Sequence, residues 1–282
     1  MTDHAVHPLA LEPLLRAAFA EDLGQAGDLT TEATVRADER AAATVGLRGA
    51  GTIAGLPVAE AAFRLYDPTL TFTALAADGD VAAAGTKLAR VEGPARSLLT
   101  AERTALNLLG RLSGIASATA TMVELVAGTG AAIVCTRKTT PGLRALEKYA
   151  VRMGGGSNHR FGLYDAVLIK DNHIAVAGGV AEAVNRVAGR VGHLVKVEVE
   201  VDSLEQLDVV LGLARVDAVL LDNFSLEDLR TAVQRVDGRL ITEASGGITR
   251  ERVRAVAECG VDLISMGWLT HSAPNLDVGL DF

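Results

Sequence analysis

Residues 194–222, LVKVEVEVDSLEQLDVVLGLARVDAVLLD, decide the class of fold to which this chain belongs. A β-rich run at 194–199 is followed by a helical pattern at 204–213 and then by a second β-rich run at 218–221. A strand, a helix and a further strand in this order are typical of a βαβ unit, in which the two strands are parallel. The stretch therefore predicts a parallel sheet covered by helices.

The same alternation continues on both sides of this stretch. Further β-rich runs lie at 131–135, 166–169, 240–242 and 262–265, with helical patterns at about 143–152, 180–190, 226–236 and 250–258. Six such units are fewer than the eight that close a barrel. The sequence leaves two architectures open, an incomplete barrel and an open sheet.

The first 130 residues follow a different pattern, which predicts a small α+β domain. We expect helices at 9–21 and 57–65 and strands at 41–47, 70–75 and 87–91. Residues 97–127 have a strong helical period, and Gly110 and Gly114 within them indicate either two helices or one bent helix. Asp28, which lies close to Thr30 and Thr31, is expected to cap a turn rather than to form a site.

The composition is that of a globular protein, because 49% of the 282 residues are hydrophobic. A net charge of −8 argues against a nucleic-acid partner. Cys135 and Cys259 have no spacing typical of a zinc site or a disulfide framework. We expect neither a signal peptide nor a membrane span, and hence a cytoplasmic protein.

Positive charge is concentrated in residues 136–173, TRKTTPGLRALEKYAVRMGGGSNHRFGLYDAVLIKDNH. Seven basic side chains and three acidic ones give this stretch a net charge of +4 within an acidic chain. A long polyanion would be repelled by the rest of the molecule, whereas a small anion would not. The stretch therefore predicts a site for small anionic ligands.

Polar side chains or glycines follow each of the six predicted strands. In chain order they are Arg137 with Lys138, Lys170, Glu200, Asp222, Ser245 with Gly246 and Gly247, and Gly267. The carboxyl ends of parallel strands meet at one edge of a sheet, where their loops build a common site. We therefore expect these residues to form one site.

Glu200 and Asp222 offer hard oxygen ligands that could bind magnesium or stabilise a developing positive charge. The alternative for Asp222 is a helix cap, because DNFSLEDL begins at this residue. Glu198 shares a face with Glu200 if the strand is regular, so one of the two could be a supporting residue. The loop Ser245-Gly246-Gly247 precedes a predicted helix and could hold a phosphate, and Gly267 would let the backbone approach the same group.

His159 and Arg160 follow the glycine run at 154–156 and must lie on a loop. The sequence leaves open whether His159 is structural or functional. His173 and Asn172 are expected to orient either Lys170 or the loop that carries it. Arg103 lies beside the apolar stripe of its helix, so it either forms a surface contact or reaches into a pocket, which could belong to a neighbouring subunit.

The chain resembles the quinolinate phosphoribosyltransferase (nicotinate-nucleotide pyrophosphorylase, carboxylating) family over nearly its whole length. The resemblance rests on motifs that occur in order along the chain: AERTALNLLGRLSGIA, TRKTTPGLRALEKYAVRMGGGSNHR, LIKDNH, VEVE, LLDNF, EASGGIT and ISMGWLTHSAP. It implies an N-terminal α/β sandwich at 1–115, joined by the C-terminal tail at 271–282. An incomplete parallel α/β barrel of six or seven strands would follow at 116–270.

The resemblance also implies a reaction and a set of site residues. Phosphoribosyl would pass from phosphoribosyl pyrophosphate to quinolinate, with magnesium as cofactor, in a homodimer. Quinolinate would be held by Arg137, His159 and Arg160 and by Arg103 of the neighbouring subunit. Phosphoribosyl pyrophosphate would be held by Lys138, Lys170, Glu200, Asp222, Ser245, Gly246, Gly247 and Gly267, and Glu200 and Asp222 would also face magnesium.

Two other functions fit parts of the same pattern. A lysine that ends a barrel strand, as Lys170 is predicted to do, is how Schiff-base lyases present their amine. Asp171 beside it argues against this reading, because a Schiff-base lysine is best kept neutral in apolar surroundings. A relative that binds phosphoribosyl compounds without turnover is the second alternative.

Overall fold

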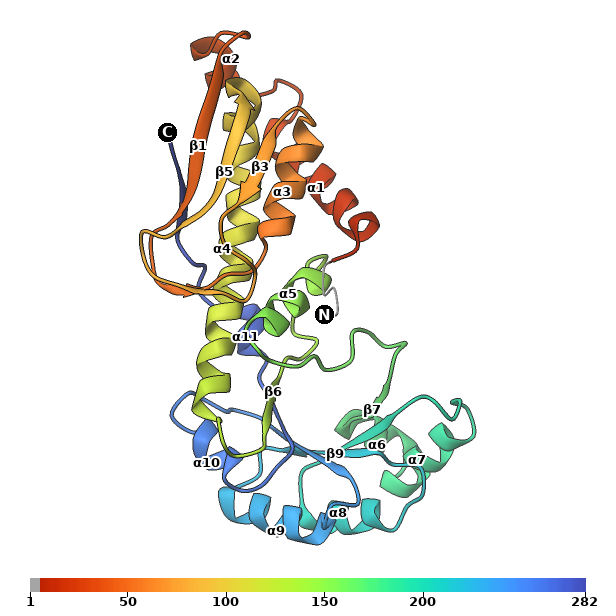
Figure 1. The fold of residues 1–282 in the computed structure, drawn as a ribbon. Coiled ribbons are helices and arrows are strands. Elements are labelled where there is room, and N and C mark those ends of the chain that lie inside the picture. The colour runs from red at the N-terminus through yellow and green to blue at the C-terminus, as the bar shows by residue number, and fades with distance from the viewer. Residues whose placement is uncertain (1–5) are drawn as a thin grey trace. The chain divides into compact units, whose positions relative to one another are not determined.

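The computed structural model describes residues 6–282 and divides into two compact units (Figure 1). Of the described residues, the first unit comprises 6–120, 140–155 and 269–282, and the second comprises 121–139 and 156–268. The expected domain boundary at 115/116 falls within the helix α4, Ala95–Leu125. No helix among the described residues is both long enough and apolar enough to span a membrane.

The first unit is built on an antiparallel sheet with the strand order β12-β1-β5-β3. These strands are β1 Arg40–Leu47, β3 Thr71–Ala74, β5 Lys87–Pro94 and β12 Val278–Asp281, and β2 Gly51–Thr52 pairs separately with β4 Val81–Ala82. The helices of this unit are α1 Pro8–Leu23, α2 Leu29–Thr34, α3 Leu56–Tyr66, α4 and α5 Arg144–Met153. The tail strand β12 pairs with β1, so the last residues of the chain complete the sheet.

One continuous helix, α4, runs through Gly110 and Gly114, so the alternative of two separate helices is wrong. A Cβ atom on Gly110 would lie 2.7 Å from the carbonyl oxygen of Leu276, and one on Gly114 would lie 2.0 Å from that of Pro274. The backbone N–H of Leu276 donates to the carbonyl of Gly110 at 2.9 Å. These glycines therefore allow the C-terminal tail to approach the helix closely, and do not break it.

Asp28 is a capping residue, as the sequence predicts, but it caps the short helix α2 and not an isolated turn. Its side chain accepts a hydrogen bond of 2.9 Å from the backbone N–H of Thr31 at the start of α2. Hydrogen bonds from Thr31 hold the pKa of this carboxyl below its ordinary value.

The second unit is a six-stranded parallel sheet with the order β6-β11-β10-β9-β8-β7. Its strands are β6 Ala132–Val134, β7 Val167–Ile169, β8 Val197–Val201, β9 Ala218–Asp222, β10 Ile241–Ser245 and β11 Leu263–Ser265. Its helices are α6 Asp171–Ala177, α7 Val180–Ala188, α8 Leu204–Leu211, α9 Leu226–Val236 and α10 Val253–Ala257, and the short α11 Trp268–His271 follows β11. The sheet does not close, because β6 and β7 stand at its two edges, and it is thus the six-stranded form of the predicted incomplete barrel.

Helices cover one face of this sheet, as Figure 1 shows for α8 and α9. The helices α8, α9 and α10 contact β8, β10 and β11, respectively. In β8, Val197, Val199 and Val201 are buried, whereas Glu198 and Glu200 alternate with them and are only partly buried. Successive side chains of a strand point to opposite faces, so both glutamates project from the face opposite to the three valines.

Candidate active site

The register of the parallel strands places the predicted site residues on one face of the sheet. Glu200 pairs with Leu220 in β9, and Leu220 pairs in turn with Glu243 in β10. Two positions further along, Asp222 pairs with Ser245. Paired residues of neighbouring strands share a face, as do residues two apart in one strand. Glu198, Glu200, Asp222, Glu243 and Ser245 therefore all project from this face.

Lys170 joins this face from the end of β7. Its ammonium group forms an ion pair with the Glu200 carboxylate, and 44% of the lysine side chain is exposed, compared with 13% of the glutamate side chain. The backbone N–H of Lys170 donates to His173 Nδ1 at 2.9 Å, so the histidine holds the loop as predicted. The ion pair with Glu200 is not the apolar environment that suits a Schiff-base nucleophile.

Asp222 does not cap the helix that follows it. The N-cap of α9 is Ser225, whose side chain accepts a hydrogen bond of 3.1 Å from the backbone N–H of Asp228. Asp222 instead accepts a hydrogen bond of 2.7 Å from the side-chain amide of Asn223. The capping alternative is thus removed for Asp222, and its carboxylate lies at the strand end with one amide partner.

The glycine loop after β10 has the conformation that only glycine adopts readily. Gly246 and Gly247 have φ angles of +94° and +56°. A Cβ atom on Gly246 would lie 2.2 Å from Asn223 Oδ1, whereas one on Gly247 would have no neighbour within 4 Å. The predicted helix at 250–258 is shorter than expected, since α10 begins at Val253, so backbone N–H groups of the loop are the better candidates for holding a phosphate. Gly267 follows β11, as the sequence predicts.

Arg137 and Arg160 are neighbouring cations of the second unit. The Arg160 guanidinium donates through Nη1 to the carbonyl of Ala166 at 3.0 Å. Its Nε atom is buried and has no hydrogen-bond partner among residues 6–282. Loss of hydration and the nearby positive charge of Arg137 lower the pKa of Arg160. Two adjacent guanidinium groups, one with a buried N–H donor to spare, are suited to binding carboxylates.

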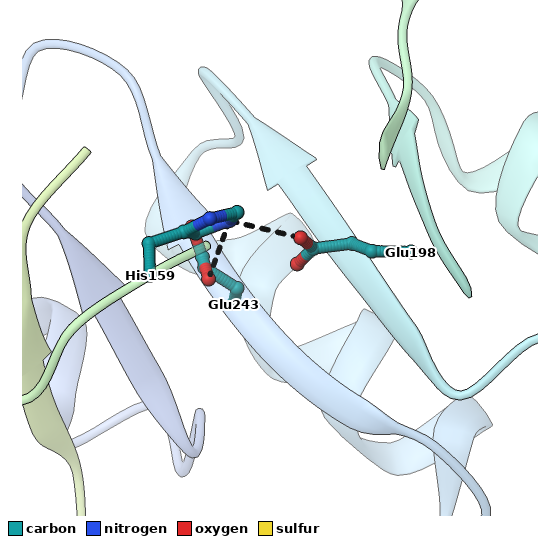
Figure 2. A group of neighbouring side chains, drawn as sticks. All are labelled: His159, Glu198 and Glu243. Carbon is teal, nitrogen blue, oxygen red and sulfur yellow. Dashed lines mark hydrogen bonds and ion pairs between the residues drawn. The ribbon is translucent and has the colours of Figure 1, made fainter. Parts of the chain in front are cut away.

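His159 lies between two glutamates that come from different strands (Figure 2). Its Nε2 atom is 3.0 Å from Glu198 Oε2 and 3.7 Å from Glu243 Oε2. Burial, and then the negative charge of Glu198, raise the pKa of Glu243 to about 7. His159 therefore contacts one partly buried carboxyl, Glu198, and one buried carboxyl, Glu243, whose pKa lies close to neutral pH.

Glu243 is the residue of this site that the sequence does not single out. The predicted strand ends at 242, so Glu243 falls outside it, whereas the observed β10 runs from Ile241 to Ser245. Its spacing from Ser245 could have identified it. The two residues are two positions apart, so they share a face of the sheet if both lie in the strand.

The remaining cations of the 136–173 stretch belong to the first unit, on α5. Arg144, Lys148 and Arg152 lie on this helix, and Lys148 is fully buried. In the same unit Glu147 binds Arg111 Nη2 at 2.9 Å. The charge excess that the sequence presents as one patch is thus divided between two units.

Two further predicted ligands lie outside the strands of the sheet. Arg103 is on a helix, and Lys138 is on the loop after β6. Arg103 is on α4, its side chain is 62% exposed, and its Nη2 atom lies 3.8 Å from Glu102 Oε1. Lys138 follows β6, and its backbone N–H donates to Thr136 Oγ1 at 3.0 Å.

Comparisons with known proteins agree with this architecture. The N-terminal domain profile of quinolinate phosphoribosyl transferase matches residues 28–113, and the C-terminal domain profile matches residues 115–281. The chain is 46% identical to the nicotinate-nucleotide pyrophosphorylase [carboxylating] of Mycobacterium leprae, over 96% of this chain and 97% of that protein. It is 40% identical to the quinolinate phosphoribosyltransferase [decarboxylating] 1b of Nicotiana tabacum, over 96% of this chain and 81% of that protein.

Solved structures give the same result. The crystal structure of NadC from Streptococcus pyogenes superimposes with a TM-score of 0.94 at 40% identity, covering 99% of this chain and 98% of the other. The nicotinate-nucleotide pyrophosphorylase of Francisella tularensis superimposes with a TM-score of 0.93 at 39% identity, covering 99% and 98%. On this evidence, together with the matches to both domain profiles, the chain belongs to the quinolinate phosphoribosyltransferase family.

Proposed function

We infer that this chain transfers the phosphoribosyl group of phosphoribosyl pyrophosphate to quinolinate and decarboxylates the adduct, which is a step of NAD biosynthesis. The products are nicotinate mononucleotide, pyrophosphate and carbon dioxide. The observation that carries this inference is the single sheet face that bears Lys170, Glu200, Asp222 and Ser245, in a chain similar to these enzymes over nearly all of its length.

Arg137 and Arg160 bind the quinolinate carboxylates in this proposal, together with His159. Quinolinate is a dianion with planar carboxylates, which a guanidinium group can bind through two parallel hydrogen bonds. The unpaired Arg160 Nε supports this role, because a buried donor without a partner gains from a ligand that accepts its hydrogen bond. Arg103 would complete the subsite from a partner subunit of a homodimer, and its 62% exposed side chain is compatible with that contact.

Glu200 and Asp222 act on the ribose. The bond from the quinolinate nitrogen to C1 of the ribose forms as the bond from C1 to the pyrophosphate oxygen breaks. Positive charge develops on the ribose ring during this exchange, and a nearby carboxylate stabilises it. Lys138 and Lys170 neutralise the leaving pyrophosphate, and the Lys170–Glu200 ion pair brings one group of each kind together.

Carboxylate oxygens are the ligands that magnesium prefers, so Glu200 and Asp222 fit this ion by their chemistry. Asp222 fits better, because Glu200 already has Lys170 as an ionic partner. When bound, magnesium would supply positive charge to the pyrophosphate oxygens. The 5′-phosphate would lie against Ser245, Gly246, Gly247 and Gly267, where Gly246 and Gly247 have positive φ angles.

Decarboxylation follows from the charge of the adduct. The ribosylated ring nitrogen is positive and stabilises the electron pair left on C2 when the 2-carboxylate leaves as carbon dioxide. A proton is then added at C2. We assign this proton to Lys138 or to water, and an unchanged decarboxylation rate of trapped adduct in Lys138→Ala would remove the lysine from this role.

The test mixes purified protein, magnesium and phosphoribosyl pyrophosphate with either quinolinate or nicotinate, and follows the mononucleotide and carbon dioxide. We expect product from quinolinate, with one carbon dioxide released per mononucleotide. Binding of phosphoribosyl pyrophosphate without product would contradict the proposal and favour a non-catalytic relative. Trapping of a carbonyl substrate on Lys170 by borohydride would favour a lyase. Sedimentation at several concentrations tests the homodimer, and cell fractionation tests the cytoplasmic location.

A further inference from the structure

Both ring nitrogens of His159 contact protein groups. Nδ1 lies 2.7 Å from the backbone nitrogen of Arg160, which can only donate a hydrogen bond. Nδ1 must therefore be the accepting nitrogen, without a proton. Nε2 then carries the proton and donates it to Glu198 Oε2 at 3.0 Å. The contacts thus select one tautomer of the imidazole, with the proton on Nε2. Figure 2 shows the two glutamates that this nitrogen faces.

Glu243 is the buried member of the cluster around His159. Its side chain is 2% exposed, its Oε2 atom is 3.7 Å from His159 Nε2, and its Oε1 atom has no hydrogen-bond partner within residues 6–282. A buried carboxyl without enough partners is costly in its charged form. Together with the neighbouring Glu198 charge, this favours a neutral carboxyl at Glu243 near pH 7.

A metal ion is the alternative occupant of the cluster. One ligand atom from each of His159, Glu198 and Glu243 lies within 4.8 Å of the others, and such a set could bind a transition metal. The surroundings argue against another cation. The positive charge of Lys170 acts on Glu243, and Arg160 already interacts with Glu198. A proton on one of the two carboxyls adds one positive charge to these surroundings, whereas a divalent metal ion would add two.

We propose that Glu198 and Glu243 are positioning residues of the acceptor subsite, which hold the His159 ring in one tautomer and thereby fix the backbone and the guanidinium of Arg160. The chain of contacts runs from the two carboxyls to Nε2, through the ring to Nδ1, and from Nδ1 to the peptide N–H of Arg160. The proposal rests on the assignment of Arg160 to quinolinate. It adds two residues to the subsite and gives His159 a role through its neighbour.

The kinetic test compares Glu243→Gln with Glu243→Leu. Glutamine keeps a polar oxygen at the position of Glu243 Oε2, 3.7 Å from His159 Nε2, and resembles the neutral carboxyl, so we expect the KM for quinolinate to stay within about threefold of wild type. Leucine has a similar volume but no acceptor, so we expect this KM to rise about tenfold or more, with little change in kcat or in the KM for phosphoribosyl pyrophosphate. The matched control is Glu227→Gln on the exposed surface of α9, which should change none of these values.

The second measurement reads the tautomer directly and does not depend on turnover. Nitrogen-15 NMR of histidine-labelled protein, with the His159 signals assigned by loss in His159→Asn, should show the Nε2–H form in wild type and in Glu243→Gln. In Glu198→Ala and Glu243→Leu we expect a mixture of tautomers. The NMR measurement remains informative even if the wild-type protein does not use quinolinate. That result would overturn the proposed function and leave the tautomer of His159 to be tested separately.

Three results would overturn the proposal. One is an equal rise of KM for both substrates in Glu243→Leu, which would indicate a general structural defect. Another is an unchanged His159 tautomer in both Glu198→Ala and Glu243→Leu. The third is a visible absorption band on titration with Co²⁺ that appears in wild type and not in Glu243→Leu, which would assign the cluster to a metal ion.

Discussion

Lys170 and Glu200, at the ends of the neighbouring strands β7 and β8, form an ion pair on the open face of the parallel sheet. The lysine side chain is more exposed than the glutamate side chain, so the pair presents its positive group outward. An exposed ammonium group beside a less exposed carboxylate suits the proposed reaction. The ammonium group can bind the leaving pyrophosphate, and the carboxylate can stabilise the positive charge that develops on the ribose.

The pair predicts the effect of replacing its acidic member. Glu200→Gln keeps the shape of the side chain and removes the charge, so kcat should fall about a hundredfold or more. The KM for quinolinate should change little, because the acceptor is assigned to other residues. Steady-state kinetics with both substrates measure this, and Glu205→Gln on the exposed first turn of α8 is the control. A wild-type kcat in Glu200→Gln would remove this residue from the transfer step.

Replacement of Arg160 by lysine should damage acceptor binding selectively. Lysine keeps the charge but loses the planar fork that matches a carboxylate. We expect the KM for quinolinate to rise at least tenfold while the KM for phosphoribosyl pyrophosphate stays within about twofold. Arg230→Lys, on the exposed face of α9, serves as the control. Equal effects on both substrates would contradict the assignment of Arg160 to quinolinate.

The two loop glycines should differ in their tolerance of alanine. Both have positive φ angles, so each substitution strains the backbone by about 1 kcal/mol. At Gly246 the new Cβ would also lie 2.2 Å from Asn223 Oδ1 and 2.9 Å from the Asn223 backbone nitrogen, whereas at Gly247 it meets nothing within 4 Å. Gly246→Ala should therefore lower the free energy of unfolding more than Gly247→Ala, by roughly a further 1–3 kcal/mol. Urea unfolding of both variants measures the difference, and equal losses would contradict it.

Glu243 should make the stability of the second unit depend on pH. Its pKa is raised from the ordinary 4.5 to about 7, so between these pH values the folded chain holds a proton that the unfolded chain releases. The free energy of unfolding contributed by this group therefore falls as pH rises from 4.5 to 7 and is constant above that range. Glutamine does not titrate, so Glu243→Gln should gain stability relative to wild type between pH 5 and pH 8, by up to roughly 3 kcal/mol.

The single tryptophan, Trp268, lies in the second unit and reports its unfolding by fluorescence. Glu227→Gln should show no such dependence, because its side chain is exposed on α9. A difference between Glu243→Gln and wild type that is the same at pH 5 and pH 8 would mean that Glu243 is not protonated at neutral pH in the folded protein.

The sequence by itself determined the order of the elements and the place of most site residues. A β-rich run, a turn and a helical period are local properties of the backbone, so the six strands of the second unit appear where the sequence predicts them, with shifted ends. The residues after these strands followed from the same reasoning, because parallel strands align their carboxyl ends. The choice between one helix and two at 97–127, and the glutamate in the middle of β10, did not follow from it.

Only the tertiary structure decided which side chains meet. The end of a strand depends on the hydrogen bonds that its neighbours offer, and β9 and β11 extend the pairing of β10 to include Glu243. His159 and Glu198 are 39 residues apart and come into contact through a loop and a strand that no local pattern relates. The sequence alone indicates Gly110 and Gly114 as possible helix breakers. The structure shows that they make room for the backbone of residues 274–276, which packs against α4. Periodicity fixes each element, whereas the contacts between elements depend on register and packing, which a linear pattern does not contain.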